Sequence, residues 1–193
     1  MIGAQPPPSS AIARSPQRPR TVFLVVGIVL ATALGVGLFT SLGTPKQVVP
    51  TVGAPAPAFS LPPLGGGARV GTPANGGGDG KPAVLVFFAS WCTPCQTEVP
   101  AIAAVYRHQV AGGRVAVIGV DGNDPTGDAL KFVHESGVTF PVAVDPYYQV
   151  TEGLYYFSGD PDAVFINGNG TIEHIVRGPI TRSELVTWER RLT

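Results

Sequence analysis

Continuous apolar runs, rather than alternating ones, mark the predicted strands in the second half of the chain. Two such runs cover residues 83–88 and 114–120. A strand that is covered on both faces needs apolar side chains at consecutive positions, so we expect these two runs to form central parallel strands. Helical character at residues 98–109, between the two runs, completes a strand–helix–strand unit with a right-handed crossover.

The C-terminal part of the chain continues this alternation of elements. The pattern predicts one more helix and three more strands, at residues 128–136, 139–144, 163–167 and 171–176. The turn Gly168-Asn169-Gly170 lies between the last two strands and predicts a hairpin. A final helix begins at Thr181, whose hydroxyl can cap the helix while Glu184 reaches back, in the arrangement called a capping box. The sequence therefore predicts an α/β domain.

The N-terminal third of the chain differs in kind from the rest. Residues 21–42 form an uncharged apolar run that is long enough to cross a hydrocarbon core of roughly 30 Å as a helix. Three arginines precede this run, and no acidic residue occurs before Asp79. The positive-inside rule then keeps the N-terminus in the cytoplasm and sends the C-terminal part across the membrane. A cleaved signal peptide and a buried core helix are the alternatives to a membrane anchor.

These observations divide the chain into four parts. Residues 1–20 are rich in proline, serine and arginine and predict a disordered cytoplasmic tail, followed by the transmembrane anchor at 21–42. Residues 43–52 form a short linker. Residues 53–193 are expected to form a single extracytoplasmic domain at the cell membrane. Within this domain the glycine-rich stretch 65–80 predicts a flexible loop.

Composition excludes several classes of protein. The 193 residues include 13 basic and 13 acidic side chains, and 13% of the residues are charged while 44% are hydrophobic. Such a balance is not that of a highly charged disordered chain, a coiled coil or a basic nucleic-acid reader, so we expect no nucleic-acid partner. The two cysteines are too few to staple a small disulfide-rich domain. They are expected to act together.

The cysteine pair lies where a predicted strand gives way to a predicted helix. The sequence there reads Trp91-Cys92-Thr93-Pro94-Cys95, and a C-x-x-C pair in this context is typical of a redox couple. The dipole and free amides of a helix N-terminus favour the thiolate of Cys92, while Cys95 is one turn further in and less exposed. A zinc site, a structural disulfide and a pair of inert core cysteines are the alternatives.

Three segments carry a resemblance to a known family. They read Val-Gly-Ala-Pro-Ala-Pro-Ala-Phe-Ser-Leu at 52–61, Val-Phe-Phe-Ala-Ser-Trp-Cys-Thr-Pro-Cys-Gln-Thr-Glu-Val-Pro at 86–100, and Gly-Asp-Pro-Asp-Ala-Val-Phe-Ile-Asn-Gly-Asn-Gly-Thr-Ile at 159–172. The chain resembles the membrane-tethered, thioredoxin-like disulfide reductases of the TlpA, ResA and DsbE type. The resemblance implies a thioredoxin-like α/β fold, with a central mixed sheet flanked by helices, an N-terminal extension, a central αβ insertion and one preceding transmembrane helix.

The same resemblance assigns roles to four residues. It makes Cys92 the nucleophile, Cys95 the resolving thiol, and Pro161 the cis-proline that faces the pair. It also suggests that Glu98 exchanges protons with the thiols, because Glu98 follows Cys95 by three residues and shares its helical face. A solvated helix residue is the alternative interpretation of Glu98.

A second set of residues is assigned to substrate binding on the strength of the resemblance. These are Trp91, Gly159 and Asp160, because a cis-proline loop exposes a backbone edge on which a peptide can dock. An anionic Asp160 would oppose the thiolate of Cys92, whereas the helix dipole would favour it. Asp162 resembles an acidic residue of the members that act in cytochrome maturation.

The implied function is that of a thiol-disulfide oxidoreductase that reduces disulfides of extracytoplasmic proteins, with apocytochrome c as a candidate client. The expected partners are these client proteins, a membrane thiol electron donor and the lipid bilayer through residues 21–42. We expect no cofactor and no metal. A peroxiredoxin-like peroxide reductase and a tethered thiol-binding or chaperone module are the alternatives, and the sequence leaves the direction of exchange open.

Overall fold

The computed structural model describes residues 25–28, 49–72, 80–109 and 114–192. Among these residues, no helix is both long enough and apolar enough to cross a membrane. The predicted tail at 1–20 and nearly all of the predicted anchor at 21–42 lie outside them; residues 25–28 are helical. The predicted four-part organisation of the chain therefore stays a prediction.

The folded part contains five strands and three helices within the described residues. In chain order they are β1 (Ala83–Phe88), α2 (Cys95–Gln109), β2 (Ala116–Gly122), α3 (Thr126–Glu135), β3 (Val142–Asp145), β4 (Asp162–Ile166), β5 (Ile172–Arg177) and α4 (Arg182–Leu192). The strands form one sheet in the order β3-β2-β1-β4-β5. β1 pairs parallel with β2 and antiparallel with β4, so the sheet is mixed and β1 lies at its centre.

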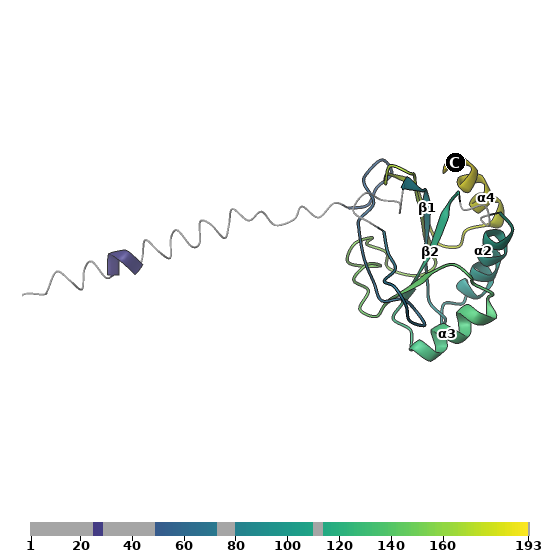
Figure 1. Ribbon diagram of the computed structural model, residues 1–193, viewed down its shortest axis with the longest axis horizontal. Coiled ribbons are helices and arrows are strands. Elements are labelled where there is room, and N and C mark those ends of the chain that lie inside the picture. The colour runs from purple at the N-terminus through teal and green to yellow at the C-terminus, as the bar shows by residue number, and fades with distance from the viewer. Residues whose placement is uncertain (1–24, 29–48, 73–79, 110–113, 193) are drawn as a thin grey trace, which may run out of the picture. The chain divides into compact units, whose positions relative to one another are not determined.

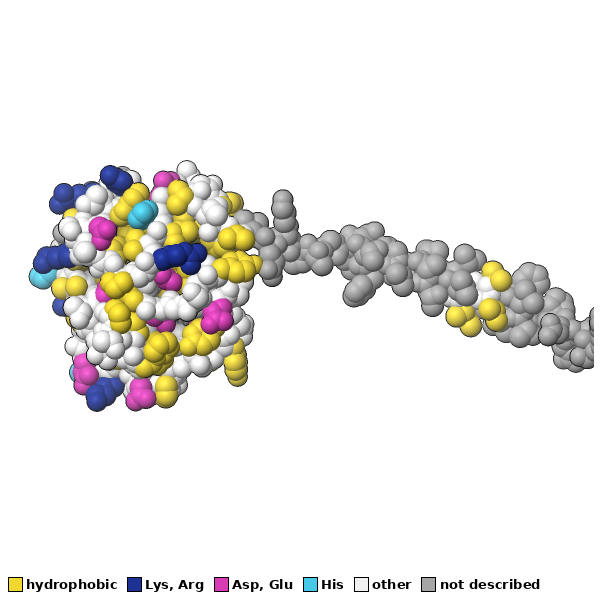
Figure 2. Space-filling view, turned by 180° about the vertical axis from the view of Figure 1, so that it is seen from behind, with side chains coloured by type: hydrophobic (Ala, Val, Ile, Leu, Met, Phe, Trp, Pro, Cys, Tyr) yellow, Lys and Arg dark blue, Asp and Glu magenta, His cyan; other side chains and the backbone are white. Residues whose placement is uncertain are grey.

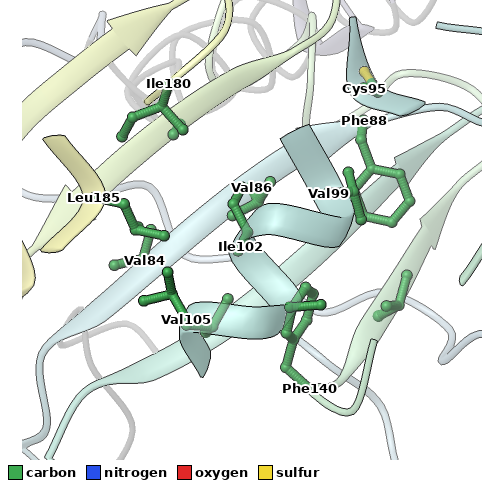
Figure 3. Packing of buried hydrophobic residues seen from close by; sticks show 14 of the residues in the cluster. Val84, Val86, Phe88, Cys95, Val99, Ile102, Val105, Phe140, Ile180 and Leu185 are labelled. Atoms are coloured by element: carbon green, nitrogen blue, oxygen red, sulfur yellow. The ribbon is translucent and has the colours of Figure 1, made fainter. Parts of the chain in front are cut away.

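The side chains of β1 alternate between two separate hydrophobic clusters. Val84, Val86 and Phe88 point to one face of the sheet, where Val99 and Ile102 of α2 pack on them (Figure 3). Helix α4 adds further apolar side chains to this cluster. Figure 1 shows α2, α3 and α4 together on this side of β1 and β2. The helices therefore cover one face of the sheet, and we call this cluster the helical core.

Irregular segments cover the opposite face. Phe87 of β1 packs there against Tyr155 and Phe157, with ring centroids 5.1 and 5.0 Å apart. Phe59 and Leu61, from the segment that precedes β1, join the same cluster. All six residues of β1 are buried because both faces are covered. This arrangement explains why the strand reads as an unbroken apolar run.

The structure confirms several predicted elements and adjusts the ends of others. β1 has its predicted bounds. The capping box is present, since Glu184 N donates to Thr181 Oγ1 (3.2 Å) and Thr181 N donates to Glu184 Oε2 (3.0 Å). Helix α2 begins three residues before the prediction, at Cys95, because the amide of Glu98 already donates to the carbonyl of Pro94.

Part of the predicted flexible loop at 65–80 is paired with the segment before it. Val70 and Leu61 form an antiparallel bridge. Thr72 is buried, and its hydroxyl donates to the carbonyl of Pro57 (3.0 Å). Residues 73–79 of this loop lie outside the described residues. The described beginning of the loop is therefore part of the N-terminal extension that covers the sheet.

The surface of the folded part is chemically mixed on the face that Figure 2 presents. Basic, acidic and hydrophobic side chains are interspersed there, and the basic ones do not gather into a continuous stripe. A nucleic-acid backbone is recognised by clustered Lys and Arg side chains. This face of the protein does not offer such a surface.

Candidate active site

The two cysteines form a disulfide at the point where β1 leads into α2. Cys92 Sγ and Cys95 Sγ are bonded, and the two Cα atoms are 5.2 Å apart. The turn between strand and helix is closed by Cys92 N, which donates to the carbonyl of Ala89 (3.2 Å). Both cysteines are predicted site residues, and the fold brings them together at the N-terminus of α2.

The environments of the two sulfur atoms differ. Cys92 is 4% exposed and Cys95 is 0% exposed, and the neighbouring Trp91 is 58% exposed. Cys95 N donates to Cys92 Sγ at 3.2 Å. A backbone amide aimed at a sulfur atom stabilises a negative charge on it, and the helix dipole acts in the same direction. When the disulfide is reduced, both effects favour a thiolate on Cys92 rather than on Cys95.

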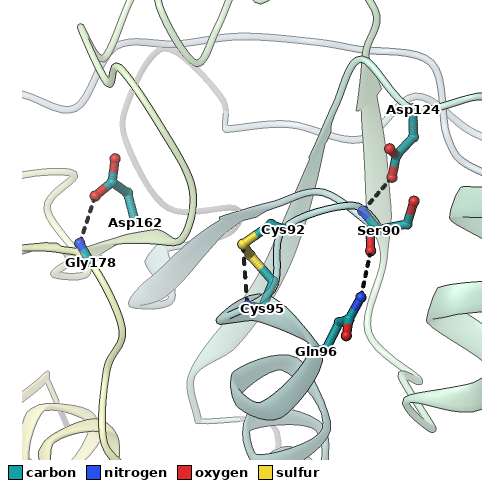
Figure 4. The surroundings of a disulfide bond; sticks show 7 residues. All are labelled: Ser90, Cys92, Cys95, Gln96, Asp124, Asp162 and Gly178. Atoms are coloured by element: carbon teal, nitrogen blue, oxygen red, sulfur yellow. Dashed lines mark hydrogen bonds between the residues drawn. A yellow bond between two sulfur atoms is a disulfide. The ribbon is translucent and has the colours of Figure 1, made fainter.

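Two hydrogen bonds hold the turn that carries Cys92. Ser90 N donates to Asp124 Oδ2 at 2.6 Å, and Gln96 Nε2 donates to the carbonyl of Ser90 at 3.3 Å. Figure 4 shows both bonds on one side of the disulfide. Asp124 comes from the loop between β2 and α3, far from the cysteines in the sequence. The turn is thus tied to a second element of the fold.

Glu98 lies in the first turn of α2 and is buried, with 5% of its surface exposed. Within the described part of the chain, neither carboxyl oxygen has a partner at full hydrogen-bond geometry, and the Ile180 backbone amide is the one polar group that favours the charged form. Burial raises the pKa of Glu98 to about 7, the charge of Asp162 adds to this rise, and the Ile180 backbone amide opposes it in part. The structure therefore does not support the interpretation of Glu98 as a solvated helix residue.

The loop before β4 lies beside the end of β1. Asp162 pairs with Phe87 in the β1–β4 register, so the residues just before it reach the start of the Cys92 turn. The peptide bond between Asp160 and Pro161 is cis, as the resemblance implies. Gly178 N donates to both the Pro161 carbonyl (2.9 Å) and Asp162 Oδ1 (3.0 Å). These bonds anchor the loop to β5 and the residues after it.

The acidic side chains of this loop have raised pKa values. Burial raises the pKa of Asp160 to about 6, and the charges of Asp162 and Asp124 contribute further. Burial also raises the pKa of Asp162 to about 6, although the bond from Gly178 and the charge of Arg177 oppose this. Near neutral pH both carboxyls are therefore largely ionised. Gly159, the other predicted substrate-binding residue of the loop, is exposed.

Sequence reasoning missed two further acidic residues of the site, Asp121 and Asp124. Asp121 lies in β2 directly opposite Phe88 of β1, and it is completely buried. Burial raises the pKa of Asp121 to about 8, and the neighbouring Asp124 and Asp160 carboxyls raise it further. The signal was present in the sequence, because Asp121 directly follows the buried parallel strand predicted at 114–120, and functional side chains gather at the carboxyl ends of such strands.

Comparison with known proteins agrees with this geometry. The AhpC/TSA family model matches residues 52–175, which include the cysteine pair and the cis-proline loop. The chain belongs to the AhpC/TSA family. It is 31% identical over 166 residues to the thiol-disulfide oxidoreductase ResA of Geobacillus thermodenitrificans, covering 86% of this chain and 90% of that protein.

Solved structures of thioredoxin-like proteins have the same fold as this chain. A putative thiol:disulfide interchange protein DsbE from Chlorobium tepidum superposes with a TM-score of 0.63 at 29% identity, covering 74% of this chain and 96% of that one. A putative thioredoxin from Neisseria meningitidis superposes with a TM-score of 0.60 at 25% identity, covering 71% and 88%. The fold is thioredoxin-like, and the chain is a thiol-disulfide oxidoreductase that uses the Cys92–Cys95 pair.

Proposed function

We propose that the protein reduces disulfides of client proteins on the outer side of a cell membrane, with Cys92 as the attacking thiol. The observation that carries this proposal is the amide of Cys95 that donates to Cys92 Sγ at 3.2 Å, at the start of a helix. Cys92 is also the less buried of the two sulfurs. The attacking thiol must be both ionised and reachable, and Cys92 meets both conditions better than Cys95.

Exchange proceeds in two steps. The Cys92 thiolate attacks one sulfur of the client disulfide, the client S–S bond breaks, and the second client sulfur leaves as a thiolate that takes up a proton. Cys95 then loses its proton and attacks Cys92 Sγ of the mixed disulfide. The first client sulfur leaves and is protonated, and the Cys92–Cys95 disulfide forms. Two electrons and two protons have passed from the protein to the client.

Glu98 is suited to assist the second step. It lies one turn after Cys95 on the same helix, and its pKa is raised to about 7. A base of this pKa is present in useful amounts in both protonation states near neutral pH, so it can accept the proton of the buried Cys95 thiol. Pro161 is assigned to the same machinery, since its cis peptide bond lies in the loop beside the Cys92 turn.

The surface around Cys92 is where a client peptide would bind. Trp91 offers a largely exposed aromatic ring next to the reactive sulfur. Gly159 is exposed and Asp160 partly exposed, in the loop that ends at the cis-proline. An extended peptide can pair with the backbone of such a loop while its disulfide meets Cys92. Trp91 would then pack on an apolar side chain of the client.

The acidic side chains near the two cysteines support the direction in which the protein reduces its clients. Asp160 and Asp162 are largely ionised near neutral pH, and a negative charge near Cys92 destabilises its thiolate. An oxidant such as DsbA is strong because its reduced form is stabilised. Destabilising the thiolate has the opposite effect and makes the dithiol a better reductant. These charges act against the Cys95 amide and the helix dipole, which stabilise the thiolate. A redox titration measures the balance, and we expect a potential below about −200 mV, on the reducing side of protein disulfide isomerase.

Location and partners follow from the N-terminal sequence and from the family resemblance. The arginine-rich residues 1–20 and the apolar run 21–42 support a single-pass anchor with the N-terminus inside, and residues 53–193 as the external domain. An external reductase needs a supply of electrons, which a membrane thiol donor would provide. Apocytochrome c is the client class that the resemblance suggests. A reporter fused after Thr193 should be active only on the outer side, and activity confined to the cytoplasm would contradict this topology.

Trapping of mixed disulfides tests the assignment of the two thiols. In the full chain, Cys95→Ser should accumulate client proteins bound through Cys92, because attack persists while resolution is lost. Cys92→Ser should trap few clients. Equal trapping by both variants would contradict the assignment. Consumption of peroxide that depends on Cys92, in the absence of any disulfide substrate, would favour the peroxide-reductase alternative instead.

A further inference from the structure

Asp124 makes the shortest of the side-chain contacts that hold the turn of Cys92. Its Oδ2 accepts a hydrogen bond from Ser90 N at 2.6 Å, and Ser90 lies two residues before Cys92. Asp124 is 9% exposed. A hydrogen bond from an amide to a carboxylate is roughly twice as strong as a neutral one, and burial strengthens it further. The position of the turn therefore depends on a side chain outside the helix that carries the cysteines.

Asp121 interacts with Asp124, and among the described residues it makes no hydrogen bond that would explain why it is buried. It is 0% exposed, and neither of its carboxyl oxygens has a partner at hydrogen-bond geometry within the described part of the chain. A buried ionised carboxyl without partners is costly, so such a group retains its proton. The raised pKa of Asp121, about 8, agrees with this expectation. A protonated Asp121 can donate to Asp124, whose Oδ2 accepts the Ser90 amide.

The other groups that face this pair come from the loop before β4, from β3 and the residues after it, and from the turn after β1. Asp160 faces it from the loop before β4. Its Oδ2 lies beside Gly122, the residue after Asp121, at 3.6 Å from the position that a Cβ atom would take there. The Tyr148 ring lies 3.1 Å from the same position. Asp145 of β3 pairs with Gly122, but its Oδ2 is occupied by the amides of Val150 and Thr151. From the turn after β1, the Ser90 backbone amide donates to Asp124.

We propose that Asp121 and Asp124 are a positioning pair for the reactive thiol: Asp124 holds the Ser90 amide and with it the Cys92 turn, while Asp121 carries the proton that lets both carboxyls be buried together. Above about pH 8 Asp121 ionises, and the pair then places a second negative charge behind the turn. That charge opposes formation of the Cys92 thiolate. The pair thereby limits the reactivity of the dithiol at alkaline pH.

This proposal rests on Cys92 being the attacking thiol, so the test must identify the thiol that reacts. The full-length protein in detergent is reduced and treated with iodoacetamide between pH 6 and 10, and the alkylated cysteine is identified by mass spectrometry. Alkylation at Cys95 in place of Cys92 would overturn the thiol assignment of the proposed function. Alkylation at Cys92 that does not respond to the substitutions below would overturn only the positioning pair.

Two substitutions at Asp124 separate its hydrogen bond from its charge. Asp124→Asn keeps an oxygen that can accept from Ser90 N, whereas Asp124→Ala removes it. We expect Asp124→Ala to slow exchange with a client disulfide about tenfold, and Asp124→Asn to recover most of that loss. Asp124→Asn should also move the alkylation profile of Cys92 to lower pH, because a negative charge has gone. Equal losses in both variants, or no loss in either, would overturn the role of Asp124.

Asp121→Asn tests the second member of the pair without changing its size. Above about pH 8 the variant should alkylate Cys92 faster than the wild type, because the second charge no longer appears. Asp128→Asn is the matched control, since Asp128 is an exposed carboxylate in the first turn of α3. A profile of Asp121→Asn that superimposes on the wild type up to pH 10 would overturn the pair. If Asp124→Ala does not fold, Asp124→Asn and Asp121→Asn still decide the question through the pH profile.

Discussion

The two sides of the Cys92–Cys95 disulfide carry buried acidic groups that are held in different ways. On the side of α2 and β4, Glu98 has no partner at full hydrogen-bond geometry within the described residues, and the charge of Asp162 contributes to its raised pKa. On the side of β2, Asp124 is bonded to the turn through Ser90 (Figure 4), and the buried Asp121 interacts with Asp124. The first side is therefore suited to proton transfer and the second to positioning.

The difference shows how one kind of side chain serves two purposes around the same bond. A carboxyl without partners is free to change its protonation state as the dithiol reacts, since no hydrogen bond is broken. A carboxylate that accepts a backbone amide holds that bond less strongly when it is protonated, because a charge-assisted hydrogen bond becomes a neutral one. The acid that exchanges protons and the acid that fixes the loop are thus best placed on different residues. Three experiments test this division, beginning with the one that has the largest expected effect.

The stability of the oxidised protein should fall as the pH rises from about 5 to 8. Asp121 and Glu98 have raised pKa values of about 8 and about 7 in the folded state, so the folded protein binds more protons than the unfolded chain in this range. Their stabilising contribution is complete below the unfolded pKa values and is lost as the pH rises through the folded ones. Each unit of pKa shift corresponds to about 1.4 kcal/mol, so the total loss amounts to several kcal/mol.

Urea unfolding of the oxidised protein at several pH values checks this expectation. At pH 8, Asp121→Asn should be more stable than the wild type by about 2 kcal/mol or more, and Glu98→Gln by less, because its pKa rises less. Near pH 5 both variants should approach the wild type. The exposed Asp128→Asn serves as control. A stability that rises between pH 5 and 8 would contradict the burial of neutral acids on both sides of the disulfide.

Glu98→Gln should lower the pKa of the Cys92 thiol by about half a unit. Glutamine keeps the size and the polar oxygen but removes a negative charge that opposes the thiolate. Alkylation rate of the reduced protein against pH measures this pKa, and the exposed Glu135→Gln on α3 is the matched control. The profile would also become simpler, because the thiols and Glu98 titrate as a group in the wild type. Superimposable curves would leave Glu98 with a packing role only.

Asp162→Asn should lower the pKa of Glu98 by a few tenths of a unit. The charge of Asp162 contributes to the raised pKa of Glu98 and is a smaller cause than burial. Asparagine retains an oxygen for the Gly178 amide, so the loop should keep its anchor. A carbon-detected NMR titration of the Glu98 carboxyl in the oxidised protein would measure the shift. An increase in the pKa of Glu98 would show that the two groups are not coupled through charge.

Much of the local structure could be predicted because it depends on neighbouring residues. The unbroken apolar run at β1 predicted its bounds, and Thr181 with Glu184 predicted the start of α4. The start of α2 was less certain from sequence, because Pro94 suits the first turn of a helix as well as the turn before it. Cys92 and Cys95 were identified from their spacing and from their place between a predicted strand and a predicted helix, since two thiols separated by two residues are within bonding distance at the start of a helix.

The sequence by itself determined the elements, the cysteine pair and the position of Glu98 one turn from Cys95, because each depends on residues a few positions apart. Only the tertiary structure decided which acidic groups surround the pair. The sheet order places β2 on one side of β1 and β4 on the other, which brings Asp121 opposite Phe88 and Asp162 opposite Phe87. No local pattern encodes that order, since it results from burying both faces of β1 at once. The pKa values that follow depend on this burial.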